Sequence, residues 1–167
     1  MHICVTRFDN KTIEENKKWK QQNNEIGCIY GTPIKITEKI LPEQEILVLE
    51  MNNSINKIEG IGIIKNNLVL KDSKKKYRIY SDNNYNRYIY KSDLHINIYN
   101  LNTKDKKIIE QLEYLLFKTN KHCKRGHGIQ IIPNNIINNK FNYVKFLINL
   151  YEKKFMNINF NKIKINY

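Results

Sequence analysis

The stretch EILVLEMNNSINKIEGIGIIKN, residues 45–66, decides the fold because it contains two apolar segments joined by a polar turn. The first segment, residues 45–52, is rich in Ile, Leu and Val, and the second, residues 55–66, contains the glycine-marked run GIGIIK. Short apolar runs bounded by Asn and Ser are typical of β-strands. The stretch therefore predicts two strands joined by a turn at Asn52-Asn53-Ser54.

The segments before and after this pair continue the β pattern, with one helix near the N-terminus. Thr12 followed by Glu15 is a capping-box pattern, and it predicts a polar helix that extends to about Asn24. Residues 94–100 alternate between apolar and polar side chains with the period of a strand. The other strands are predicted at 2–8, 26–31, 33–40, 68–71, 76–81 and 88–91, and a further apolar run lies at 129–133.

Helical spacing dominates the chain after residue 102. Thr103 is a plausible N-cap for a helix with apolar residues at 108, 109, 112, 115 and 116, and a second amphipathic helix is predicted over 140–155. The tail 156–167 alternates, with a bulge expected near Asn161-Lys162. Since residues 25–100 offer no helices to connect parallel strands, we predict an α+β fold with a mostly antiparallel sheet, one N-terminal helix and two C-terminal helices.

Length and composition favour one intracellular domain. A chain of 167 residues suits a single domain, here 1–167 with a core of about 1–100 and a basic helical extension of about 101–167. No apolar run is long enough to span a membrane, and MHICVTRFDN lacks the pattern of a signal peptide. Cys4, Cys28 and Cys123 show no paired spacing, which favours a reducing, cytoplasmic location.

The distribution of charge is more informative than its total of +13. Lys and Asn are abundant and Ala is absent, so the codon usage of an AT-rich genome explains much of the lysine content. Codon usage should spread lysine evenly, however. Residues 1–70 hold 9 basic and 9 acidic residues. Residues 71–91 hold 7 basic and 2 acidic residues, and residues 114–167 hold 10 basic residues and 1 acidic residue. Two basic segments predict contact with nucleic acid or another polyanion, and the alternative is a solvated face.

The first basic segment interleaves aromatic and basic residues. Tyr85, Tyr88 and Tyr90 can stack on unpaired bases, while Arg87 can hold a phosphate with its planar guanidinium. The alternative is that these tyrosines fill half-buried strand positions. Trp19, the only tryptophan, has the same two interpretations, a core anchor or the wall of a base pocket. Gly60 and Gly62 share one strand face, so a flat ring or another backbone, or a tightly packed helix, is expected against that face.

The second basic segment contains HCKRGHG, residues 122–128, which has three chemical interpretations. As a metal site it has His122, Cys123 and His127 but no second ligand pair, so neither a metal nor another cofactor is expected. As a catalytic loop it offers the same three residues without an orienting third group, so an enzyme is not the favoured class. As a phosphate clamp it has Lys124, Arg125 and Gly126, with a backbone that can turn its N–H groups toward an anion. The clamp fits best, and a helix-ending loop is the structural alternative.

The strand ILVLEMN followed by the glycine-marked GIGIIK, after a first strand and a helix, resembles the PUA-like superfamily, which includes the EVE, ASCH and YTH domains. This resemblance covers about residues 1–100 and implies a small β-barrel with flanking helices that binds RNA or modified bases. YNRYIYK and LLFKTNKHCKRGHGIQIIP, with the codon bias, also resemble small proteins of large DNA viruses of protists. That second resemblance implies a viral factory in the host cytoplasm.

Together these features predict a non-catalytic nucleic-acid-binding module with RNA or single-stranded DNA as its partner. Two alternatives stay open, a nucleic-acid-processing enzyme that uses His122, Cys123 and His127, and a virion or scaffold protein that packs polyanions. No membrane partner is expected, and the sequence leaves the oligomeric state undetermined. The residues expected to bind nucleic acid are Trp19, Tyr85, Arg87, Tyr88, Tyr90, His122, Lys124, Arg125, Gly126 and His127.

Overall fold

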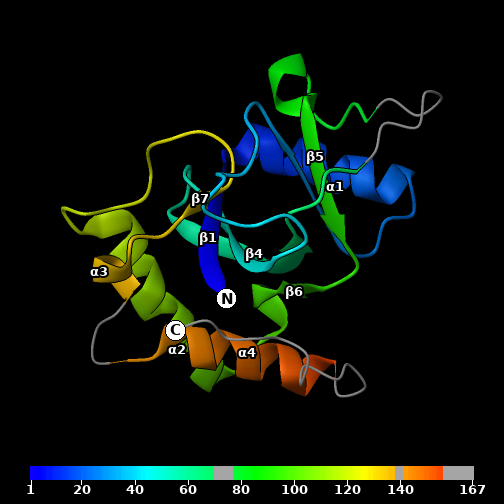
Figure 1. Cartoon of the computed structure of the whole chain (residues 1–167). Coiled ribbons are helices and arrows are strands. Elements are labelled where there is room, and N and C mark those ends of the chain that lie inside the picture. The colour runs from blue at the N-terminus through cyan, green and yellow to red at the C-terminus, as the bar shows by residue number, and fades with distance from the viewer. Residues whose placement is uncertain (70–76, 138–140, 156–167) are drawn as a thin grey trace.

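A five-stranded sheet with the order β6-β4-β3-β1-β7 lies at the centre of the computed structural model, which describes residues 1–69, 77–137 and 141–155 (Figure 1). Strands β1 and β3 are parallel, and the other neighbours in this sheet are antiparallel. A separate antiparallel pair joins β2 to β5. The strands are β1 (His2–Phe8), β2 (Cys28–Thr32), β3 (Glu45–Asn52), β4 (Lys57–Lys65), β5 (Tyr88–Ser92), β6 (His95–Asn97) and β7 (Gln130–Ile131).

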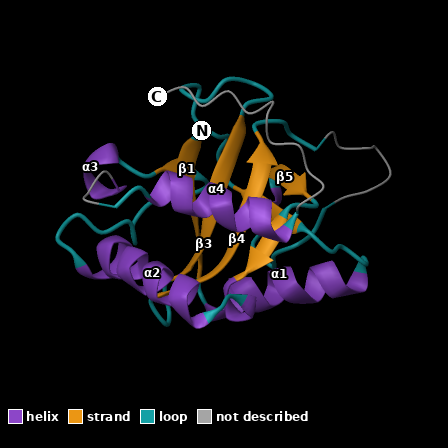
Figure 2. Ribbon diagram, turned by 90° about the horizontal axis from the view of Figure 1, so that it is seen from below, coloured by secondary structure: helices purple, strands orange, loops and turns teal. Residues whose placement is uncertain are grey.

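The helices cover both faces of this sheet. Figure 1 shows α2, α3 and α4 on one side of β1 and β4, with α1 and β5 on the other, and in Figure 2 helix α4 crosses the strands from the first side. No described helix is both long enough and apolar enough to cross a bilayer. The α-helices are α1 (Asn10–Gln22), α2 (Thr103–Glu113), α3 (Asn134–Ile137) and α4 (Tyr143–Lys154), with a π-helical turn η3 (Tyr114–Lys118) after α2 and short 3-10 turns η1 (Asn83–Asn86) and η2 (Ile98–Asn100).

The alternation of side chains along β1 explains why the sheet is covered twice. Ile3 and Val5 join a core with the helices α2, α3 and α4, whereas Cys4 and Phe8 join a second core with α1, β2 and β5. Successive strand residues point to opposite faces, so a strand that is apolar at nearly every position needs an apolar layer on each side. This arrangement confirms the predicted α+β class, the mostly antiparallel sheet and the N-terminal helix. Two C-terminal helices were predicted, but the described residues after 102 contain three, since the short helix α3 lies between α2 and α4.

Two predicted helix starts are wrong by a few residues. Asp9, not Thr12, caps α1: its side chain accepts a hydrogen bond from Thr12 N at 2.7 Å, and the Thr12 hydroxyl lies 2.9 Å from Asp9 N and accepts a hydrogen bond from it. An ionised Asp is a better acceptor for the free N–H groups of a first turn than the threonine hydroxyl three residues later. In the same way Asn102 caps α2 through Asp105 N, at 2.9 Å, in place of Thr103.

Two segments predicted as strands bond their backbone to side chains instead. Ile36 N, within the predicted strand 33–40, donates to the Tyr90 hydroxyl at 3.0 Å. Ile79 N and Tyr80 N, within the predicted strand 76–81, both donate to Asn86 Oδ1. When side chains accept the hydrogen bonds of these backbone N–H groups, the segment does not have to pair with a neighbouring strand. The apolar residues of the two segments are therefore buried without forming part of a β-sheet.

The remaining differences concern strand lengths and closure. Residues 98–100 form a 3-10 turn rather than the end of a strand, and 68–69 form no strand. The predicted bulge at Asn161-Lys162, the start of the second C-terminal helix at 140 and the residues 70–76 lie outside the described residues. Over the residues described, the strands form two separate sheets rather than the closed barrel expected from the resemblance.

A buried polar cluster lies against the face of β4 that carries Gly60 and Gly62. The Tyr30 hydroxyl donates to Glu50 Oε1 at 2.9 Å, and His95 Nε2 lies 3.0 Å from the same oxygen. A Cβ at Gly60 would lie 2.5 Å from His95 Nε2 and overlap the Glu50 carboxyl group. The two glycines therefore make room for the Tyr30 ring and for the side chains of Glu50 and His95. This is the close approach of a ring that the sequence predicted, and not the packing of a helix.

The Glu50 carboxyl group should make the stability depend on pH. Burial acts to raise its pKa, but the contact with His95, the charges of His95 and Lys20 and the Tyr30 hydroxyl outweigh it, so the pKa lies below the ordinary value of 4.5. A pKa lowered by folding contributes stability above the unfolded pKa, and that stability is lost as the pH falls through the folded pKa.

We therefore expect the free energy of unfolding to drop as the pH falls below about 4.5, and Glu50→Gln to remove part of that drop while costing about 1.5–3 kcal/mol at pH 7. Urea unfolding at pH 7 and pH 3.5 measures both effects. Glu14→Gln changes an exposed carboxyl group of α1 and serves as the control. An identical pH dependence in the Glu50→Gln variant would contradict this account.

Candidate nucleic-acid interface

The loop 122–128 begins where the π-helical turn η3 ends. His122 N donates to Thr119 O at 3.1 Å and Cys123 N to Leu116 O at 2.7 Å, which ends the helical segment and directs the Cys123 side chain into the core beneath α2 and α4. The side chains of His122, Arg125 and His127 are exposed. The loop therefore has one apolar anchor and presents its basic side chains to solvent.

Two side chains from the central sheet attach this loop to the molecule. Arg7 Nε donates to Cys123 O at 2.5 Å, and Asn53 Nδ2 donates to Lys124 O at 2.9 Å. Arg7 belongs to the end of β1, and Asn53 to the turn between β3 and β4. Burial lowers the pKa of Arg7, but an arginine stays charged at neutral pH, so a positive group is fixed beneath the loop.

The two glycines of the loop have backbone conformations that side-chain-bearing residues rarely adopt. Gly126 has a φ of +117° and Gly128 a φ of +68°. Within the described part of the chain, the backbone N–H groups of residues 124–128 donate no hydrogen bond. These donors are thus available to an anion, as the sequence-based clamp requires.

A basic groove lies beside the loop, with a volume of about 580 Å³. It is lined by five permanent cations and by His122, and no carboxylate is among its described lining residues. Clustered cations that lack ion-pair partners create a positive potential that attracts polyanions. The five cations are Arg7, Lys35, Lys39, Lys121 and Arg125.

A second cavity, which we call the β1 cavity, has a volume of about 370 Å³ and lies at the carboxyl end of β1. Arg7 lines both this cavity and the basic groove, so the two share a wall. Tyr80 and Tyr85 line the cavity with their rings 6.2 Å apart and nearly perpendicular. The absence of a side chain at Gly31 allows the Tyr80 ring to pack here, because a Cβ at this position would lie 2.9 Å from the ring. The site therefore combines a cationic surface with an aromatic pocket.

The structure brings together only part of the predicted set. His122 and Arg125 line the groove, Tyr85 lines the β1 cavity, and the Tyr88 ring lies 5.7 Å from Lys35 Nζ. His127 Nδ1 lies 3.5 Å from the Tyr85 hydroxyl. Arg87 and the Lys124 side chain line neither space, while the rings of Trp19 and Tyr90 are 9% and 1% exposed and belong to the core.

Sequence reasoning missed most of the groove and cavity residues. Lys35, Lys39 and Lys121 come from segments without any distinctive motif, and only the fold places them on one surface. Arg7 could have been noticed from the sequence, because arginine is rare in this chain and supplies only 4 of the 29 basic residues. Glu15 and Asn53 were assigned only structural roles from the sequence, Glu15 in a capping box and Asn53 in a turn, and neither pattern indicates a binding site.

The Cys123 side chain of the loop is buried. Burial raises the pKa of the Cys123 thiol, against the effect of the nearby Arg7 charge, and a raised pKa disfavours the nucleophilic thiolate. In the described part of the chain, no three His, Cys, Asp or Glu side chains are grouped as metal ligands. The exposed histidines contribute hydrogen-bond donors to the surface.

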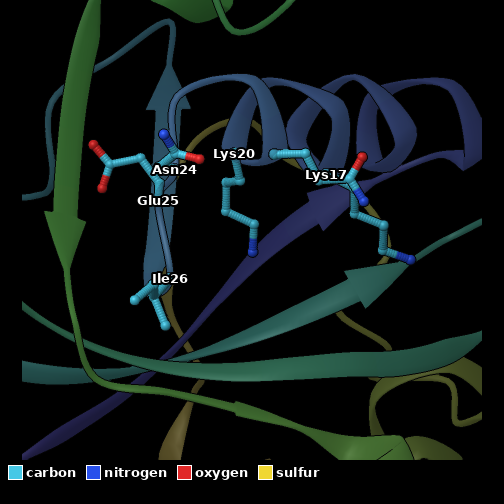
Figure 3. Close-up of a pocket in the computed structure, with 6 residues that line it drawn as sticks. Lys17, Lys20, Asn24, Glu25 and Ile26 are labelled. Carbon is cyan, nitrogen blue, oxygen red and sulfur yellow. The ribbon is translucent and has the colours of Figure 1, made fainter.

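Another hollow, with a volume of about 540 Å³, lies at the end of α1. Figure 3 shows the residues that line it. Lys17 and Lys20 extend from the helix toward the strands, but Lys17 Nζ is paired with Glu59 at 2.6 Å and Lys20 Nζ donates to Gly27 O at 3.3 Å. Glu25 is likewise paired with Lys91 at 2.6 Å. Since these charged groups already have partners, this hollow is a weaker candidate than the basic groove.

Arg7→Met should loosen the loop without unfolding the chain. The substitution removes the hydrogen bond to Cys123 O, and a charged donor of this kind contributes about 1.5–3 kcal/mol. We expect amide hydrogen exchange at His122 and Cys123, whose N–H groups are hydrogen-bonded to Thr119 O and Leu116 O, to accelerate about tenfold or more. Arg78→Met, at an exposed arginine, is the control. Unchanged exchange in the Arg7→Met variant would show that Arg7 does not hold the loop.

Comparison of the chain with protein-family models, with curated proteins and with solved structures finds no match in any of the three. The PUA-like resemblance therefore stays a prediction from the sequence. The candidate function depends on the geometry of the groove and the β1 cavity.

Proposed function

We propose that this protein binds single-stranded nucleic acid along the basic groove, and that RNA is its preferred partner. The observation that carries the proposal is the convergence of five cations from β1, the segment after β2 and the loop 121–125, without a carboxylate among the described lining residues. Lys and Arg contacts to phosphates supply most of the affinity of sequence-independent nucleic-acid binding.

The aromatic residues beside the groove support a single strand over a duplex. Tyr85 lines the adjoining β1 cavity, and Tyr88 lies next to Lys35. Unpaired bases can stack on such rings, each contact contributing about 1–3 kcal/mol, whereas paired bases of a duplex are not available to them. The PUA-like fold is part of the same proposal, supported by the order of strand, helix and glycine-marked strand and by the described α+β architecture.

A salt titration of oligonucleotide binding tests the proposal. Fluorescence anisotropy with single-stranded and duplex probes should show tighter binding of the single strand, with a log–log salt slope of about −3 to −4, since each phosphate contact to a single strand contributes about −0.7. Absence of salt-dependent binding at low ionic strength would refute it. Equal affinity for single strands, duplexes and heparin would instead indicate a protein that packs polyanions.

A further inference from the structure

The β1 cavity contains polar atoms that the protein itself does not satisfy. Among the described residues, five buried side-chain nitrogen or oxygen atoms lack a hydrogen-bond partner. Three of the five belong to residues that line this one cavity: Arg7 Nη1, Glu15 Oε2 and Asn53 Oδ1. Buried polar atoms are nearly always paired in native proteins, so three unpaired atoms around one cavity point to a ligand.

The surrounding contacts explain why these three atoms stay unpaired. Arg7 uses Nε for Cys123 O, Asn53 uses Nδ2 for Lys124 O, and the other oxygen of Glu15 lies 4.0 Å from Lys11 Nζ. Each side chain is thereby attached to the protein through one end.

We infer that the β1 cavity receives one unpaired guanine of the bound strand, an inference that rests on the proposed function. The three unpaired atoms are one cationic donor, Arg7 Nη1, and two acceptors, Glu15 Oε2 and Asn53 Oδ1, so a group that pairs with all three has two donors and one acceptor. Asp9, Asp82 and Lys11 also line the cavity, but Asp9 accepts from Thr12 N, Asp82 accepts from Asn84 N, and Lys11 is paired with Glu15. Among the four RNA bases, only guanine presents two donors and one acceptor on its Watson–Crick edge, as N1–H, N2–H and O6. Cytosine and uracil each present two acceptors and one donor, and adenine presents one of each.

The walls and size of the cavity agree with a base. Tyr80 and Tyr85 provide aromatic surface, and a volume of about 370 Å³ is at the lower end of the range of small-ligand sites. Arg7 also lines the basic groove, so a strand whose phosphates lie in the groove can direct one base past the guanidinium into the cavity. A site that hydrogen-bonds such an edge discriminates strongly against bases that leave its buried groups unpaired.

The test compares RNA nonamers of uridine in which only the central base differs: uridine, guanine, adenine, cytosine or hypoxanthine. We expect guanine to bind at least tenfold more tightly than the other natural bases. Hypoxanthine, which lacks the N2 amino group, should bind with an intermediate affinity. This comparison requires no variant of the protein, so it stays informative even if substitutions unfold the chain.

Two variants then assign the preference to the cavity. Glu15→Gln should abolish the preference for guanine, measured as the ratio of the affinities for the guanine and all-uridine nonamers, and Asn53→Leu should reduce that ratio in the same way. Glu14→Gln, one residue away on the exposed face of α1, should retain it. Salt-dependent binding with equal affinity for all central bases, or a guanine preference that survives Glu15→Gln, overturns this inference. Absence of any salt-dependent binding overturns the proposed function instead.

Discussion

Replacing Lys35, Lys39, Lys121 and Arg125 together with Ala is expected to weaken binding of a single-stranded RNA by about 10²- to 10³-fold at about 0.1 M salt. The four residues line the basic groove, and their side chains are exposed, so their loss should leave the fold intact. Each phosphate contact contributes about 0.7 to the magnitude of the salt slope. Losing four contacts reduces the magnitude of the slope by about 2.8. If the two proteins bind equally at about 1 M salt, where these contacts contribute little, the affinities at about 0.1 M salt differ by a factor of about 10²·⁸.

The matched control removes the same amount of charge elsewhere. Lys18, Lys104, Lys107 and Lys153 are exposed residues of α1, α2 and α4 and do not line the groove. Their fourfold replacement with Ala should change the affinity by less than about tenfold, because exposed charges more than a Debye length from the strand are largely screened. Equal losses in the two fourfold variants would show that net charge, and not the groove, determines binding.

Gly62→Ala is expected to destabilise the protein by about 3 kcal/mol or more. A Cβ at this position would overlap the Tyr30 hydroxyl oxygen and lie 2.7 Å from Cys28 Sγ and 3.1 Å from the Tyr30 ring. Tyr30 is 1% exposed, so its ring has no free space to enter. Urea unfolding should show the loss as a lower midpoint with an unchanged slope.

A double-mutant cycle separates this clash from a general effect on the strand. Tyr30→Phe alone removes the hydrogen bond to Glu50 and should be destabilising. In the Gly62→Ala background, however, the same change removes the oxygen that the new Cβ meets, so the double variant should be more stable than the sum of the single effects predicts. Strict additivity, or a Gly62→Ala variant as stable as the original protein, would contradict the packing described here.

Sequence patterns predicted the elements whose apolar spacing is long and regular. The strands of residues 45–66, the first strand 2–8 and the helix after Thr103 appear nearly where expected, because burial on a sheet or helix face imposes a period on the sequence. The segments 33–40 and 76–81 are equally apolar, yet their backbone is held by the Tyr90 hydroxyl and the Asn86 side chain. Such long-range side-chain bonds leave no periodic signal, so these segments were wrongly predicted as strands.

The candidate site was predictable only where a local motif carried it. The loop 122–128 was recognisable from its clustered glycines and basic residues, and Gly126 and Gly128 both have a positive φ. The β1 cavity was not predictable, since Arg7, Glu15 and Asn53 are separated by up to 46 residues and come from β1, α1 and the turn after β3. Trp19 and Tyr90 illustrate the opposite case, where an aromatic residue suited to stacking fills the core.

The most direct test of the central claim is an NMR titration of the protein with an RNA nonamer at low salt, followed through the backbone amide signals. We predict that the shifts concentrate on residues 6–8, 35–39 and 121–128, and that added salt reverses them. Shifts spread evenly over the lysines of α1, α2 and α4, or an absence of shifts at residues 121–128, would contradict the assignment of the basic groove as the nucleic-acid interface.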